Sequence, residues 1–204
     1  MAIKPSKQNR IPARGRGKRN ELDQCIRRSF EVMLGDIFVT VGTTQFQRLI
    51  DTLLDSNTLA ALQEKGCQKL IIQKGQSVVA SSTLESLQRL PFHVEVYDYK
   101  PSLREDIAQA DLVIAHAGAG TSLEVLEEGR KPLIVVVNEA LMDNHQIELA
   151  EKLANEGHCH YCHCETLVEV IESFDPSSLR PLTPGQPDLF AQYFQDTLKA
   201  TFNF

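Results

Sequence analysis

The stretch from Asp111 to Glu124 constrains the fold more than any other part of the sequence. It begins with the apolar run Leu-Val-Ile-Ala (112–115), passes through Gly118 and Gly120, and continues as Thr-Ser-Leu-Glu. This order predicts a buried strand, a tight turn and the first turn of a helix. Glycines permit a positive φ and a close approach of the backbone to a ligand, because they lack a Cβ atom. The first turn of a helix has unpaired N–H groups and a dipole that favours negative charge, so this segment suits a phosphate or diphosphate.

The same residues also allow other interpretations. Thr121 and Glu124 have the spacing of a capping box, in which a helix satisfies its own first N–H groups. A dinucleotide site is a further alternative, because Glu139 follows the two glycines by about 20 residues. However, Leu123 occupies the place of the third glycine of that fingerprint, and the turn follows the fourth expected strand instead of the first. Both departures count against a nicotinamide-dependent dehydrogenase.

Short apolar runs alternate with helical patterns through the chain. The expected strands cover residues 36–41, 69–73, 93–97, 112–115, 132–137 and 158–164. The expected helices cover residues 45–65, 102–110, 121–128, 143–155, 166–174 and 188–200, with the Ser- and Gln-rich residues 76–92 as a loop. A second capping box, of Ser102 and Glu105, is expected to start one of these helices. The alternation predicts an α/β chain with a Rossmann-like, doubly wound parallel sheet.

Two further groups of polar residues follow expected strands. Gly42, Thr43 and Thr44 form a second strand–glycine–helix turn, whose hydroxyl groups can cap the helix or bind a ligand. Residues 138–146, which comprise the loop after the fifth strand and the start of the next helix, are rich in polar side chains. Ligands of doubly wound sheets bind beyond the carboxyl ends of the strands. These segments and Gly118 are therefore expected to share the ligand-binding edge.

Individual side chains at that edge keep more than one interpretation. His116 directly follows the fourth strand, where it can act as a base, donate to a phosphate or simply end the strand. Asn144, His145 and Gln146 are donors and acceptors that suit the hydroxyl and acetamido groups of a neutral hexose. Asp143 and Gln146 can instead form a capping box. The sequence alone leaves these alternatives open.

The charge distribution narrows the function classes. Residues 1–30 hold nine Lys or Arg and two acidic residues, whereas the rest of the chain holds 12 basic and 25 acidic residues. The basic segment is expected to be disordered, and the acidic remainder argues against a nucleic-acid-binding domain. No apolar run approaches the ~20 residues of a membrane span, and the N-terminus lacks the apolar core of a secretory signal. These features predict a cytoplasmic protein.

The run from His158 to Cys164, His-Cys-His-Tyr-Cys-His-Cys, raises the question of a metal site. In a strand, His158, His160, Cys162 and Cys164 would share one face, because side chains alternate. Structural zinc sites usually draw pairs of ligands from turns at other spacings. Five cysteines are an odd number without the spacing of a disulfide framework, which indicates reduced thiols. Buried thiols and edge histidines are the favoured interpretation, and no metal or cofactor is expected.

Three motifs together carry a resemblance to a known family. They are Phe38–Thr44, Asp111–Glu124, and Lys131–Asn138 continued by Leu141–Gln146. They resemble the C-terminal, nucleotide-sugar-binding half of GT-B glycosyltransferases, over about residues 36 to 200. The most specific likeness is to the catalytic subunits of the two-component N-acetylglucosaminyltransferase of dolichol-linked oligosaccharide synthesis, which are related to the bacterial lipid II GlcNAc transferase.

The resemblance implies a single GT-B donor-binding domain with UDP-GlcNAc as the donor substrate. The turn of residues 118–121 would hold the diphosphate, and Glu124 would bind the uridine ribose. Residues 144–146 would contact the GlcNAc, and residues 42–44 would face the interdomain cleft. Carried over by motif, the donor-binding residues are Gly42, Thr43, Thr44, Gly118, Ala119, Gly120, Thr121, Glu124, Asn144, His145 and Gln146. The general base would come from a partner, with His116 as the candidate in this chain.

The resemblance also implies a partner. The reaction would add the second GlcNAc to GlcNAc-diphosphodolichol on the cytosolic face of the endoplasmic reticulum, and a membrane-anchored subunit would supply the acceptor domain. In this organisation residues 1–34 are a basic extension, residues 35–180 the Rossmann-like domain, and residues 181–204 a linker and a C-terminal docking helix. The alternative is a non-catalytic nucleotide-sugar-binding or regulatory protein of the same fold.

Overall fold

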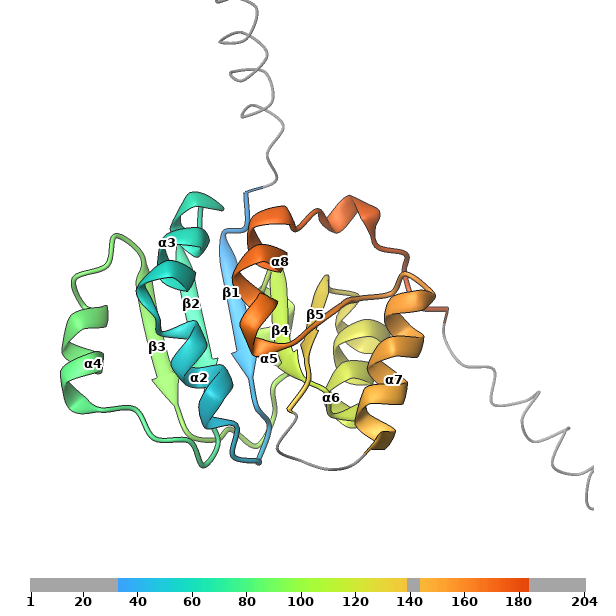
Figure 1. Ribbon diagram of the computed structural model, residues 1–204, viewed down its shortest axis with the longest axis horizontal. Coiled ribbons are helices and arrows are strands. Elements are labelled where there is room, and N and C mark those ends of the chain that lie inside the picture. Colours follow the sequence, from blue (N-terminus) through green and yellow to red (C-terminus); the bar gives the residue numbers. More distant parts are fainter. Residues whose placement is uncertain (1–32, 139–143, 184–204) are drawn as a thin grey trace, which may run out of the picture. The chain divides into compact units, whose positions relative to one another are not determined.

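The strands form a parallel sheet whose order is that of a doubly wound fold. The computed structural model describes residues 33–138 and 144–183 (Figure 1). Within these residues the sheet has six strands in the order β3-β2-β1-β4-β5-β6, each parallel to its neighbours. The strands are β1 Asp36–Thr40, β2 Lys69–Gln73, β3 His93–Tyr97, β4 Leu112–His116, β5 Leu133–Val136 and β6 His160–Cys162. The chain builds outward from β1 to β3 and restarts at β4 on the other side of β1, so the predicted Rossmann-like fold is confirmed.

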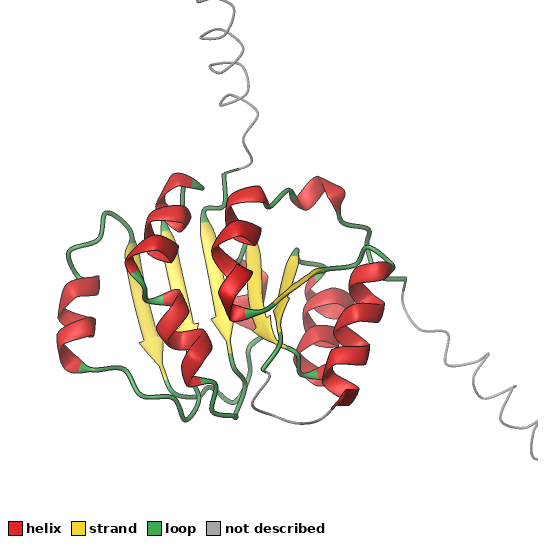
Figure 2. Cartoon of the chain, in the orientation of Figure 1, coloured by secondary structure: helices red, strands yellow, loops and turns green. Residues whose placement is uncertain are grey.

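Helices connect the strands and cover both faces of the sheet (Figure 2). They are α2 Gln47–Leu53, α3 Ser56–Glu64, α4 Ser81–Leu87, α5 Arg104–Gln109, α6 Ala119–Leu123, η1 Glu124–Gly129, α7 Asn144–Asn155, η2 Cys164–Thr166, α8 Leu167–Ser173 and η3 Pro176–Ser178. Figure 1 shows α2, α3 and α8 in front of the sheet. The residues of α5, η1 and α7 pack with the opposite face.

Two hydrophobic layers hold the sheet between these helices. In β1, Ile37 and Val39 belong to the layer that includes α2, α3 and α8, whereas Phe38 belongs to the layer of α5 and α7. All three side chains are at most 1% exposed. β4 and β5 are buried along their whole length. Burial on both faces is typical of parallel strands and explains why these segments read as continuous apolar runs.

The prediction of one long helix at residues 45–65 is wrong, because the chain forms the two helices α2 and α3 there. The break follows from a run of side chains that bond to the backbone. Asp55 caps α3 by accepting a hydrogen bond from the N–H of Asn57 at 2.9 Å, and the hydroxyl of Thr58 donates to the carbonyl of Thr52 at 2.6 Å. Such bonds compete with helix continuation.

Two other segments differ from the predicted elements. Residues 76–92, expected to be a loop, contain α4, which the sequence hides because Leu87 is its one buried residue. The strand expected at residues 158–164 is shorter. Residues 160–162 pair with β5, and the 3₁₀ turn η2 begins at Cys164.

Two capping boxes are absent: the one begun by Thr121, which was an alternative interpretation, and the one expected at Ser102. α6 starts earlier than expected, with Gly118 as its N-cap and no side-chain cap, so Thr121 lies inside the first turn. α5 has Leu103 as its N-cap, whose side chain cannot accept a hydrogen bond. Ser102 lies one residue before the cap and accepts from the N–H of Arg104 at 3.3 Å.

Some predictions fall outside the described residues, namely the helix at 188–200 and residues 1–32 of the basic extension. Leu34 is described and is 1% exposed, and its N–H donates to the carbonyl of Lys65 at 2.8 Å. The described core therefore already includes Leu34. No helix in the part of the chain that the structure describes has the length and apolar character of a membrane span.

Candidate functional site

A cavity of about 510 Å³ opens at the carboxyl edge of the sheet, beside the ends of β1 and β4. These two strands are neighbours, and the strand order reverses between them. The cavity therefore lies at the topological switch point, where ligands bind in doubly wound sheets. Its lining residues are Gly42, Thr43, Thr44, Gln73, Tyr99, Lys100, Pro101, Ser102, Leu103, Arg104, His116, Gly118, Gly120, Thr121 and Glu124.

The turn after β1 forms one wall of this cavity. Gly42 has a φ of 64°, which favours glycine, and its N–H donates to the hydroxyl of Thr40 at 2.9 Å. The hydroxyl of Thr44 donates to the carbonyl of Val41 at 2.8 Å, so it serves the turn itself. Thr43 is exposed and lines the cavity. Of the two threonines, Thr43 is thus the better placed to contact a ligand.

The turn after β4 contains two glycines with different structural roles. Neither has the positive φ that the sequence suggested, and Gly118 has a φ of −83°. A Cβ atom on Gly118 would lie 2.4 Å from Nε2 of His116, so a close approach of the imidazole requires glycine there. A Cβ atom on Gly120 would meet nothing within 4 Å. Gly120 therefore leaves space on the cavity side of the helix start.

The start of α6 keeps its N–H groups without a side-chain cap. Ser122 is buried, and its hydroxyl and N–H both bond to the carbonyl of Gly118, at 2.9 and 3.0 Å. These bonds close the turn, and Gly120 and Thr121 lie on the cavity wall. A helix start without a side-chain cap attracts an anion through its N–H groups and its dipole. This arrangement favours the anion-binding interpretation over the capping box.

Glu124 lines the cavity at the point where α6 passes into the π-helical turn η1. Single π-helical turns occur frequently at functional sites. The turn ends against α5, because a Cβ atom on Gly129 would lie 2.5 Å from Cγ2 of Ile107. Arg130 follows the turn as its C-cap and takes the left-handed conformation with a φ of 49°.

His116 lies at the base of the cavity and is 7% exposed. Burial lowers the pKa of its imidazole, and a backbone interaction with Thr40 opposes this shift. Nδ1 nevertheless has no partner of hydrogen-bond geometry among the described residues. The ring is therefore neutral near pH 7 and can donate or accept one hydrogen bond toward a ligand.

The sequence analysis missed the third wall, formed by the connection from β3 to α5. Every residue from Tyr99 to Arg104 lines the cavity. Lys100 and Arg104 bring positive charge to a site proposed for an anion. Their position directly after the third expected strand was a usable signal, because that strand ends at the same edge as β1 and β4.

Some of the expected site residues either do not line the cavity or have side chains that the structure does not describe. Ala119 is exposed but does not line the cavity. Asn144, His145 and Gln146 form the first turn of α7, so they follow β5 at the same edge of the sheet. Their side chains lie outside the described part of the structure, and their contact with a sugar remains a prediction.

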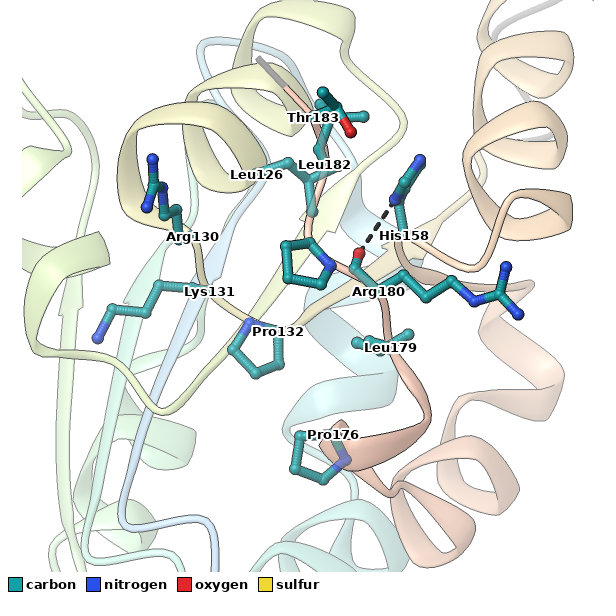
Figure 3. A pocket seen from close by; sticks show the side chains of 11 residues that line it. Leu126, Arg130, Lys131, Pro132, His158, Pro176, Leu179, Arg180, Leu182 and Thr183 are labelled. Atoms are coloured by element: carbon teal, nitrogen blue, oxygen red, sulfur yellow. Dashed lines mark hydrogen bonds between the residues drawn. The ribbon is translucent and has the colours of Figure 1, made fainter.

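Another cavity, of about 480 Å³, lies at the opposite edge of the sheet (Figure 3). Pro132 directly precedes β5, and His158 precedes β6, so both mark the amino ends of strands. The imidazole Nδ1 of His158 bonds to the carbonyl of Arg180 at 3.0 Å. Leucine and proline side chains supply much of the remaining wall. This edge is not the ligand edge of a parallel sheet.

In the His- and Cys-rich run, the prediction of buried thiols is confirmed. Cys159, Cys162 and Cys164 are buried, and burial raises the pKa of the Cys159 and Cys162 thiols to about 12. The ring of His160 packs edge-on against Phe174, with a centroid distance of 5.3 Å. Among the described residues, no three His, Cys, Asp or Glu side chains are grouped to hold a metal ion.

The fold and this site together define a class. A Rossmann-like sheet with two glycine turns around a cavity at the switch point has the architecture of nucleotide-binding α/β domains. Residues 36–198 match the model of the glycosyltransferase family 28 C-terminal domain, and the chain belongs to that family. The expected relationship to the C-terminal half of GT-B glycosyltransferases is thereby confirmed.

Similar proteins agree with this family. The human UDP-N-acetylglucosamine transferase subunit ALG13 is 50% identical over 131 residues, which are 64% of this chain and 11% of that protein. The chain thus spans about a ninth of the length of this relative. The protein of the same name from Eremothecium gossypii is 30% identical over 186 residues, covering 78% of this chain and 91% of the relative.

Solved structures show the same fold. The NMR structure of ALG13 has a TM-score of 0.58 at 27% identity and covers 79% of this chain and 96% of that one. Acinetobacter baumannii MurG has a TM-score of 0.56 at 22% identity, over 76% of this chain and 46% of its own. The likeness to MurG supports the fold alone.

Proposed function

We propose that this chain is the donor-binding subunit of a glycosyltransferase that uses UDP-GlcNAc. The observation that carries the proposal is the cavity at the switch point, where both glycine turns, His116 and Glu124 meet. Membership of a glycosyltransferase family supports the reaction class. The choice of donor is supported by the relatives, whose name is UDP-N-acetylglucosamine transferase subunit.

The donor would bind along the start of α6. Its diphosphate would lie on the uncapped N–H groups near Gly120, where even an added Cβ atom would meet nothing within 4 Å. The carboxylate of Glu124 would accept hydrogen bonds from the ribose hydroxyls. Residues 144–146, at the start of α7, would contact the GlcNAc. The donor would thus extend along the carboxyl edge from η1 to α7.

The reaction would be a direct displacement at the anomeric carbon with inversion. Negative charge then develops on the departing UDP, and the fixed N–H groups and dipole of the helix start would stabilise it. His116 would add one hydrogen bond to the bound donor. At 7% exposure it is poorly placed to take a proton from an acceptor that enters from solvent. The general base is therefore assigned to the partner.

A second protein would complete the active site. A GT-B enzyme binds its acceptor on another domain across the cleft, and the cavity described here belongs to the donor side. The printed name of the relatives includes the word subunit, which supports a two-component enzyme. We assign to the partner the acceptor domain and a membrane anchor at the endoplasmic reticulum. The acceptor would be GlcNAc-diphosphodolichol, and this chain would be recruited from the cytoplasm.

Calorimetry tests the donor assignment. The full chain, alone and with its partner, is titrated with UDP, UDP-GlcNAc and NAD. UDP-GlcNAc should bind, and Glu124→Ala should weaken it about tenfold, the usual effect of one lost hydrogen bond to a ligand. Glu127→Ala is the matched control, because Glu127 is exposed in the same turn and does not line the cavity. Binding of NAD without binding of either uridine nucleotide would refute the proposal.

A transfer assay separates the enzyme from its alternative. A non-catalytic nucleotide-sugar-binding protein of this fold would bind UDP-GlcNAc as well. Any transfer by its complex would be the partner's own activity, so Glu124→Ala would leave that transfer unchanged. The catalytic subunit should make transfer depend on Glu124.

A further inference from the structure

In the cavity wall formed by the connection from β3 to α5, Leu103 is partly buried and packs against the core. Asp98, Tyr99, Pro101, Ser102 and Arg104 are all exposed. Tyr99 is 61% exposed, so its ring does not anchor the segment in the core. Such a segment needs a polar anchor to keep one conformation, because few buried contacts mean easy local opening.

Asp106 supplies that anchor from the first turn of α5. It is 7% exposed, and its carboxylate accepts three hydrogen bonds. The hydroxyl of Tyr97, at the end of β3, donates to Oδ2 at 2.5 Å. The ammonium group of Lys100 donates to Oδ1 and Oδ2, at 3.0 Å each. One carboxylate therefore joins the strand before the connection, its central residue and the helix after it.

Further contacts fix Lys100 in this position. Its Nζ atom lies 4.2 Å from the centroid of the Tyr97 ring and 3.7 Å from a carboxylate oxygen of Glu95. Burial, together with the hydrogen bond to Asp106, raises the pKa of Tyr97, so its hydroxyl remains a donor. Lys100 lines the cavity, whereas Asp106 and Tyr97 do not.

We propose that Asp106 is a positioning residue of the donor site: through Tyr97 and Lys100 it holds the 98–104 connection against the two glycine turns. It acts through Lys100 and touches no ligand itself. This inference rests on the proposed function, because it assigns a wall of the proposed nucleoside-diphosphate site. A carboxylate that only stabilised the fold would lower the free energy of unfolding when replaced. It would not weaken UDP binding more than an unrelated substitution with the same loss of stability does.

The test compares Asp106→Asn and Tyr97→Phe in the full chain. Ile171→Val is the matched control, because Ile171 is 0% exposed in α8 and belongs to the other core layer. Amide hydrogen exchange without ligand should be about tenfold or more faster at residues 98–104 in both test variants, and unchanged there in the control. The dissociation constant of UDP should rise about tenfold in the test variants. It should stay unchanged in the control variant, even where the control loses as much thermal stability as the test variants do.

Each outcome decides the proposal. Unchanged exchange at residues 98–104 overturns it, as does faster exchange there with unaltered UDP affinity. A wild-type chain that binds neither UDP nor UDP-GlcNAc, even with its partner, overturns the proposed function instead. In that case the exchange measurement alone decides whether Asp106 anchors the connection.

Discussion

The imidazole of His116 occupies the space that a side chain on Gly118 would need. A Cβ atom on Gly118 would lie 2.4 Å from Nε2, and one on Gly42 would lie 2.9 Å from Cε1. The glycine turns after β1 and β4 thus close around one ring. A side chain at either position would have to displace the ring or the turn.

The two glycines of the second turn should respond in opposite ways to alanine. Gly118→Ala should lower the free energy of unfolding by about 1–3 kcal/mol, because the added methyl group overpacks His116. Gly120→Ala should leave stability unchanged or raise it by up to about 1 kcal/mol, because alanine is the better helix former and meets nothing. It should still weaken UDP about tenfold if the diphosphate lies against Gly120. Urea denaturation and calorimetry measure the two effects, and full UDP affinity in Gly120→Ala would contradict the placement of the diphosphate.

Stability should depend on pH through His116. Burial lowers the pKa of this histidine below its ordinary value of 6.5, and the same holds for His160. Below pH 6.5 the unfolded chain therefore binds more protons than the folded chain, and the free energy of unfolding falls as the pH drops toward the folded pKa. Urea denaturation at pH 7.5 and 5.5 should show this loss. His116→Gln should lose less stability over the same interval, and an identical loss would show that His116 does not contribute.

Gln146 distinguishes a sugar contact from a helix cap. If residues 144–146 contact the GlcNAc, Gln146→Ala should reduce transfer by about tenfold to a hundredfold, which corresponds to roughly 1–3 kcal/mol for a substrate group without its partner. Thermal stability should change little. Transfer rates and melting temperatures are measured on the same complex. Activity that falls only in proportion to the folded fraction would make Gln146 a structural cap.

The partner prediction is tested by reconstitution. The purified chain alone should transfer little or no GlcNAc to a lipid-diphospho-GlcNAc acceptor, because half of the cleft gives neither the proximity nor the charge stabilisation that catalysis needs. Addition of the membrane-anchored partner should restore transfer and recruit the chain to the endoplasmic reticulum. Deletion of residues 188–204 should abolish both if this segment docks the partner. Rapid turnover by the chain alone would contradict the two-component enzyme, whereas normal recruitment after the deletion would contradict only the docking role.

The sheet was predictable because its buried strands are recognisable in the sequence as short apolar runs. β4 is buried on both faces, so Leu112–Ala115 had to be a continuous apolar run, and glycine turns followed at the carboxyl end. The same logic located the turns at Gly42 and Gly118 on the edge where the structure places the cavity. Both turns were visible without any tertiary information.

Other parts of the site depend on contacts between distant segments. The role of the 98–104 connection comes from one carboxylate, Asp106, and no local pattern reveals that Tyr97 and Lys100 meet there. The helix starts were also misjudged, because Thr121 has capping chemistry while the helix begins earlier at Gly118. The reason for Gly118 itself, room for His116, became visible only in three dimensions.

The position of the cavity has a consequence for how the chain acquires its site. β1 and β4 pair directly, and the N–H of Asp36 bonds to Oδ2 of Asp111 at 2.9 Å across 75 positions of sequence. Closing so long a loop costs entropy that is recovered only when the two strands pack. During synthesis, a nascent chain whose β4 is still inside the ribosome has the turn at Gly42 but nothing opposite it. Under the proposed function, donor binding would require the assembled central strand pair. UDP should therefore slow hydrogen exchange in β1 and β4 more than in β3 at the sheet margin.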